Sequence, residues 1–164
     1  MSTPGSLVDQ LAATDFFSGM AENELELLAR HAQATEHDAG VLILQRGRPA
    51  SGFYLITEGR VALQLQTSRG ALVVQTLGRG DVLGLSWLIA PRVWQFSAKA
   101  LTPISSIHFE TDALLEAAEQ DVAIHDDLVS RFMGLLAKRL HSTRLQLLDL
   151  YQPAVYQGTD EWIR

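Results

Sequence analysis

The residues best suited to binding a ligand gather in one segment, Gly80–Ala100. It contains two indoles, Trp87 and Trp94, whose flat faces could stack on a planar or apolar molecule. It also carries one guanidinium, Arg92, that could pair with an anion. Backbone N–H groups at the start of a short helix near Leu85 could face an anion as well. The chemistry that these residue types suggest is recognition of a small molecule.

Core packing is the plainer interpretation of the same segment. Leu85, Trp87 and Trp94 would then be large apolar side chains that fill the space a ligand would need. Both interpretations stay open on the sequence alone. The candidate ligand-binding residues are Gly84, Leu85, Ser86, Trp87, Arg92, Trp94, Gln95 and, further along the chain, Thr143.

Catalytic and metal-binding patterns are not found. The five histidines show neither a His-x-His nor a His-Glu-x-x-His spacing, so no metal site is expected. A nucleophile elbow, a phosphate loop and a dinucleotide fingerprint are also missing. The chain has no cysteine, which excludes disulfides and thiolate metal sites. We therefore expect no catalytic residues and no certain cofactor, and an enzyme is the least favoured class.

Charge and hydropathy limit the classes of partner that the chain is expected to bind. The chain has 164 residues and a formal net charge of -6, and its basic residues are scattered, so direct DNA binding is not expected. Its apolar runs are short and interrupted, and residues 1–10 do not resemble a secretory signal. These features predict a cytoplasmic protein with no membrane association.

Short β runs separated by Gly, Pro, Asp and Ser must position the segment. They fall about ten residues apart, which is typical of a small antiparallel barrel or jelly roll. The expected strands are 41–45, 53–57, 60–66, 72–77, 96–101 and 104–109. Helices are expected at 7–13, 22–33, 111–119 and 121–151, with Thr111 or Asp112 as the cap of the third and Pro153 ending the last. A short helix is also possible at 83–89. The predicted fold class is α+β, mainly β: a double-stranded β-helix or jelly roll with flanking N-terminal helices and a long C-terminal helix.

The stretch Gly47–Leu63 resembles a known protein family. It runs Gly-Arg-Pro-Ala-Ser-Gly-Phe-Tyr-Leu-Ile-Thr-Glu-Gly-Arg-Val-Ala-Leu, and Gly59 stands where a hairpin must reverse. The order resembles the opening hairpins of the cyclic-nucleotide-binding domain family, the ligand-gated sensor domains of bacterial transcription regulators, kinase regulatory subunits and channels. The resemblance covers residues 7–151 and implies a cyclic nucleotide, such as cyclic AMP, as the family's ligand.

The family's ligand cassette is altered in this chain. In the family it reads Gly-Glu-Leu-Ala/Gly-Leu and later Arg-Ala/Ser-Ala/Thr, where the Glu accepts a ribose hydroxyl and the Arg pairs with the phosphate. Here Leu85 stands at the place of the Glu and Trp94 at the place of the Arg. Arg92 lies two residues before Trp94 and could substitute if the loop shifts. Cyclic nucleotide binding is therefore expected to be weak or absent.

The long C-terminal helix carries a heptad stripe. Its apolar positions alternate four and three residues apart, as in a two-helix seam. The stripe consists of Val129, Met133, Leu136, Leu140, Thr143, Leu147 and Leu150. We expect a homodimer, with a helix that folds back on its own barrel as the alternative. The resemblance also implies that a Thr near Thr143 contacts the adenine of bound cyclic AMP.

The DNA-reading module of the bacterial regulators is not expected here. They continue from this helix into a winged helix-turn-helix, whereas thirteen residues follow Tyr151. We therefore expect one domain over residues 1–151 and a short tail over 152–164. The leading hypothesis is a stand-alone regulatory or sensor module that acts through a protein partner. A genuine small-ligand sensor and an accessory member of the regulator family are the alternatives.

Overall fold

The structure, a computed structural model, describes residues 5–156. The chain divides into two compact units, Met1–Val122 and Ala123–Arg164. All strands of the described residues lie in the first unit, and the second consists of nearly the whole of one long helix. The expected domain boundary after residue 151 stays a prediction. None of the helices in the described part of the chain is long and apolar enough to cross a bilayer.

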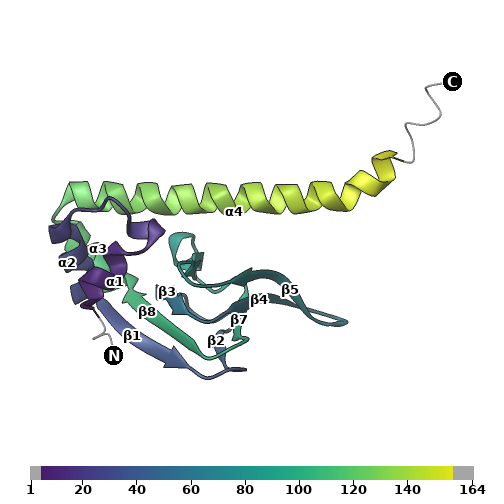
Figure 1. The fold of residues 1–164 in the computed structure, drawn as a ribbon, viewed down its shortest axis with the longest axis horizontal. Helices are drawn as coiled ribbons and strands as arrows, with labels where there is room; N and C mark the ends of the chain where they lie inside the picture. The colour runs from purple at the N-terminus through teal and green to yellow at the C-terminus, as the bar shows by residue number, and fades with distance from the viewer. Residues whose placement is uncertain (1–4, 157–164) are drawn as a thin grey trace. The chain divides into compact units, whose positions relative to one another are not determined.

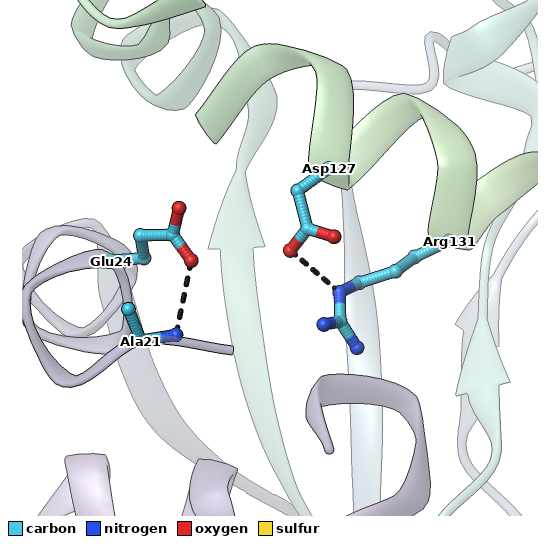
Figure 2. A network of polar contacts seen from close by, with 4 residues as sticks. All are labelled: Ala21, Glu24, Asp127 and Arg131. Atoms are coloured by element: carbon cyan, nitrogen blue, oxygen red, sulfur yellow. Dashed lines mark hydrogen bonds and ion pairs between the residues drawn. The ribbon is translucent and has the colours of Figure 1, made fainter. Parts of the chain in front are cut away.

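The first unit opens with short helices whose ends are fixed by acidic side chains. Helix α1 (Leu7–Ala12) begins at Ser6, whose Oγ accepts from the backbone N–H of Asp9 while the Asp9 carboxylate accepts from the N–H of Ser6. After the 3-10 turn η1 (Asp15–Phe17), α2 (Glu22–Arg30) begins at Ala21. The Glu24 carboxylate accepts from the Ala21 N–H at 3.1 Å, as Figure 2 shows. Both starts satisfy donors that a helix leaves unpaired.

Helix α2 ends earlier than the sequence predicts, because residues 32–37 form a strand. The predicted helix over 22–33 is wrong beyond Arg30. Strand β1 (Ala32–His37) pairs antiparallel with β8 (Ile104–Glu110), from Ala32 opposite Phe109 to His37 opposite Ile104. Backbone hydrogen bonds to β8 therefore decide the conformation of a stretch whose side chains have little strand character.

Eight strands within the described residues form two four-stranded antiparallel sheets, which confirms the predicted jelly-roll fold class (Figure 1). One sheet has the order β1-β8-β3-β6 and the other β2-β7-β4-β5. The remaining strands are β2 (Leu42–Leu44), β3 (Gly52–Glu58), β4 (Val61–Thr67), β5 (Gly70–Leu77), β6 (Val82–Leu83) and β7 (Ser97–Ala100). Gly59 has φ +96 at the turn between β3 and β4, as the sequence suggests. The predicted hairpin there is wrong, because β3 and β4 lie in different sheets and do not pair with each other.

Helix α3 (Thr111–Ala118) follows β8 directly, and its first residue does not cap it as predicted. The N-cap is Glu110, without a side-chain cap bond. Thr111 instead is buried, and its Oγ1 donates to the Ser51 carbonyl at 2.8 Å. A threonine that was expected to start a helix therefore joins α3 to the beginning of β3.

Helix α4 (Val122–Tyr156) makes up nearly all of the second unit. It continues past Pro153, so the predicted end before that proline is wrong; proline removes one helical N–H donor, and the helix lasts one more turn. Asp127 and Arg131 form a partly buried i,i+4 ion pair at 2.8 Å along it (Figure 2). The predicted tail falls largely outside the described residues.

Candidate functional site

Gly84 and Trp94 meet at the centre of the candidate segment. Gly84 follows β6 with φ +92, a conformation that glycine adopts without strain. A Cβ added there would lie 2.9 Å from both Cη2 and Cζ3 of Trp94 and 3.4 Å from the carbonyl oxygen of Gly52. Trp94 is 8% exposed. The indole that the sequence predicts at the place of the family's phosphate-binding Arg is thus packed directly on the glycine turn.

Main-chain hydrogen bonds hold the loop that carries Trp94. Residues 92–94 run alongside residues 47–50, the stretch that precedes β3. The bonds run from Gly47 N to Trp94 O at 2.9 Å, from Trp94 N to Arg48 O at 2.9 Å, and from Ala50 N to Arg92 O at 2.8 Å. The place of the Trp94 indole is therefore fixed by the backbone on both sides of it.

Trp87 belongs to a column of stacked aromatic rings. It lies in the 3-10 turn η2 (Ser86–Leu88) and is 6% exposed. Its ring stacks on Phe53 at a centroid distance of 5.8 Å, and Phe53 stacks on Phe109 at 4.6 Å. Phe109 in turn contacts Phe17 of η1 at 5.8 Å. One face of this indole is therefore occupied by the core, as the packing interpretation requires.

The polar residues of the segment bond mainly within it. The Gln95 N–H donates to Ser86 Oγ at 3.1 Å, which ties the end of the loop to η2. The Gln95 side chain donates to the Val93 carbonyl at 3.3 Å. Leu85 is half-buried just before η2, with no polar atom to meet a ribose. The predicted residues from Gly84 to Gln95 are brought together, and their role in binding stays a prediction.

Arg92 lies at the surface, where its side chain is accessible to solvent. It has φ +56, an uncommon conformation for a residue with a side chain. Its guanidinium is 58% exposed and lies 3.9 Å from the Asp112 carboxylate, which is 80% exposed. An exposed pair of this kind contributes about 0–1 kcal/mol, so little holds the Arg92 guanidinium in place. An anion could therefore compete with Asp112 for this guanidinium.

Thr143 belongs to the second unit. It is exposed on α4, and its Oγ1 donates to the Arg139 carbonyl at 2.9 Å, one turn back. This bond satisfies the hydroxyl within the helix. Its predicted contact with a ligand stays a prediction.

Two titratable residues beside the segment were not among the predicted site residues. Tyr54 and His108 face each other across β3 and β8, with ring centroids 4.5 Å apart. Burial raises the pKa of Tyr54 and lowers the pKa of His108. The negative charge of Glu110 raises the pKa of His108, but by less than burial lowers it. A Cβ added at Gly52 would lie 2.8 Å from His108 Nε2, and one added at Gly84 would lie 3.4 Å from the Gly52 carbonyl oxygen, so Gly52 adjoins both His108 and Gly84. Strand register, which a single sequence does not reveal, brings them together.

Two hollows lie away from the segment. They measure about 500 and 420 Å³ and share Pro103 and Ser105. They are lined by Glu58, Gly59, Arg60 and Thr102 in one case and by Glu36, His37, Asp38 and Ile104 in the other. Among the residues that the structure describes, no group of three or more His, Asp or Glu side chains is placed to hold a metal ion.

Comparison with known proteins agrees with the fold. The model of the cyclic nucleotide-binding domain family matches residues 34–121, more than half of the 164 residues. The chain belongs to this family. The chain is similar to the acetyltransferase Pat of Mycolicibacterium smegmatis, with 33% identity over 93% of this chain and 42% of that protein. It is also similar to the HTH-type transcriptional regulator Cmr of Mycobacterium tuberculosis, with 23% identity over 78% of this chain and 51% of the regulator.

Solved structures share the architecture. A cyclic nucleotide-binding domain from Methylobacillus flagellatus superposes with a TM-score of 0.76 at 19% identity, covering 88% of this chain and 82% of that one. At this identity the likeness concerns the fold. The chain spans about half or less of the length of Cmr and Pat, so it corresponds to one part of each.

Proposed function

We propose that this domain is a regulatory module with an altered nucleotide pocket, which acts through a protein partner. The observation that carries the proposal is the contact between Trp94 and Gly84. An apolar indole, buried and held by main-chain bonds, takes the place of a guanidinium that would bind phosphate. A phosphate at this place would lose its bidentate partner and meet an apolar surface instead.

The position of Leu85 supports the same proposal. A ribose hydroxyl that faces a half-buried leucine loses its acceptor, and an unpaired buried hydroxyl costs about 1–3 kcal/mol. Loss of both partners therefore predicts weak cyclic nucleotide binding or none. One relative is a transcriptional regulator, which fits a role in regulation, and this domain corresponds to a part of that protein.

A genuine small-ligand sensor is the second candidate, and Arg92 favours it. Its guanidinium is more than half exposed, and its ion pair with Asp112 is long. An anionic ligand that draws Arg92 away from Asp112 would be bound by an arginine two positions before Trp94, where the family has its phosphate-binding Arg. This candidate requires that Arg92→Ala abolish the binding of the ligand.

Titration with cyclic AMP and cyclic GMP separates the two. Tryptophan emission and the melting temperature are followed for the wild type, for Arg92→Ala, and for Leu85→Glu/Trp94→Arg, which restores both family residues. A ligand at about a hundred times its Kd adds about 2.7 kcal/mol of stability. We expect no response from the wild type at micromolar ligand and a response from the restored variant. A wild-type shift at micromolar ligand that Arg92→Ala removes would establish the sensor instead.

We also propose that α4 mediates a homodimer. Along its heptad stripe, large apolar side chains remain exposed in the single chain. They are Val129 (44%), Met133 (64%), Leu140 (52%), Leu147 (49%) and Leu150 (75%). An exposed apolar stripe of this length at coiled-coil spacing supports burial against the same helix of a second copy.

Light scattering tests the dimer with a matched pair of variants. Leu140 lies in the stripe and is 52% exposed, while Leu148 lies outside it and is 58% exposed. We expect a dimeric wild type, a monomeric Leu140→Glu variant and a dimeric Leu148→Glu variant. A wild type that stays monomeric at high concentration would contradict the proposal.

A further inference from the structure

Strand β5 is an open edge of its sheet. It is last in the order β2-β7-β4-β5, and its pairing partner is β4. Within residues 5–156, no backbone hydrogen bond joins its outer side to another segment. The hairpin of β4 and β5 extends from the rest of the sheet in Figure 1. An edge of this kind offers a row of N–H and C=O groups to an additional strand.

The usual protections of an edge are weak in β5. Proteins guard such strands with charged side chains, prolines or bulges. From residue 70 to 77 the strand has no charge and no proline, and Leu72 and Val73 are 55% and 50% exposed. One bulge occurs, between Gln75 and Val73 on β5, and it leaves residues 70–73 regularly paired with 64–67. Residues 75–77 are regularly paired with 61–63 on the other side of the bulge, so a strand can dock along the whole of β5.

The charges beside β5 specify what docks there. Arg69 and Arg79 stand just outside its two ends and are both exposed, in a chain whose net charge is -6. Pairing of β5 with β5 of a second copy would bring these arginines near one another at both ends, which is unfavourable. A foreign strand with acidic ends meets no such repulsion, and its charges are complementary to the arginines.

We propose that β5 accepts an extended segment of a protein partner, with an uncharged apolar middle and acidic residues at both ends. Backbone bonds to β5 would hold the segment, and Arg69 and Arg79 would select its ends. The inference rests on the proposed function in one respect, that the domain acts through a protein partner. It needs no nucleotide, so it is tested without one.

The probe is a labelled nonapeptide, Glu-Glu-Val-Thr-Val-Thr-Val-Glu-Glu, whose binding is followed by fluorescence anisotropy. A second peptide with lysines in place of the four glutamates is the charge control. We expect the wild type to prefer the acidic peptide by at least about tenfold and less so at high salt. Arg69→Glu/Arg79→Glu should reverse the preference. Equal binding of both peptides, or of neither, would overturn the proposal.

Two lysine variants locate the binding site on the chain. Val73→Lys places a charge in the middle of the edge and should lower the affinity by at least about tenfold. Leu145→Lys on α4, where the leucine is 48% exposed, should leave the affinity unchanged. Melting temperatures confirm that both variants are folded. If Val73→Lys alone lowers the mass of the wild-type assembly in sedimentation, a second copy covers the edge and the proposal is wrong. If the peptide does not bind, the result expected of the nucleotide titration stays the same, so the two proposals can fail separately.

Discussion

Replacing Gly84 by alanine probes the contact between the glycine turn and Trp94. The new Cβ has two separate costs. The backbone angle φ +92 lies in the left-handed region, where a side chain costs about 1–2 kcal/mol. The Cβ would also lie 2.9 Å from two indole carbons, so Trp94 must leave its rotamer, at about 0.5–1.5 kcal/mol more. We expect the free energy of unfolding to fall by about 2–3 kcal/mol.

A double-mutant cycle separates the two costs. Unfolding is measured in urea by tryptophan emission for Gly84→Ala, for Trp94→Phe and for the double variant. Phenylalanine lacks the outer indole carbons, so the double variant should be more stable than the sum of the single effects predicts, by at least about 0.5 kcal/mol. Gly80→Ala is the matched control, because Gly80 has φ +85 and nothing within 4 Å of an added Cβ.

Additivity would refute the packing described for Trp94. If the effects of Gly84→Ala and Trp94→Phe add within about 0.3 kcal/mol, the indole does not rest on the turn. The same conclusion follows if Gly84→Ala costs no more than Gly80→Ala. The control should show no coupling to Trp94 in either case.

Three further predictions concern other parts of the chain. Gly134→Ala on α4 should raise the free energy of unfolding by about 0.5–1 kcal/mol, since an added Cβ meets nothing within 4 Å; calorimetry checks this, and a lower melting temperature would contradict it. Thr111→Val should cost about 1 kcal/mol in urea unfolding by removing the bond to Ser51, whereas Thr111→Ser should retain most of it; equal losses would count against the bond. Because the pKa of His108 is lowered in the folded state, its contribution to stability should be constant above the unfolded value of about 6.5 and decrease as pH falls through the folded pKa. His108→Gln should flatten this part of the curve of unfolding free energy against pH, and an unchanged slope would contradict the assignment.

Much of the fold could be predicted because its strands have the usual marks. The β3 and β4 strands carry apolar and β-branched residues and are separated by Gly59, so the sequence placed them within a residue or two. Strand β1 was missed for a physical reason. Ala32 continues the helical spacing from Leu28, and the strand has no long apolar or aromatic side chain. What makes it a strand is the ladder to β8, seventy residues later in the chain.

The residues of the candidate site could be predicted from the sequence, but most of their arrangement could not. Burial of Trp87 and Trp94 agrees with the packing interpretation, which followed from their size and apolar character. The loop around Arg92 could not be foreseen, because its shape comes from bonds to residues more than forty positions earlier. The pairing of Tyr54 with His108 likewise depends on strand register.

The ladder between residues 47–50 and 92–94 has a consequence for how this loop can change. Its three hydrogen bonds use main-chain atoms alone, so most side chains at Val93 would leave them intact. Removing or inserting one residue between Arg92 and Trp94 would keep the Arg92 bond and the two Trp94 bonds from forming together. The loop is therefore tolerant of substitution and intolerant of a change in length, which is the reverse of the usual behaviour of a surface connection.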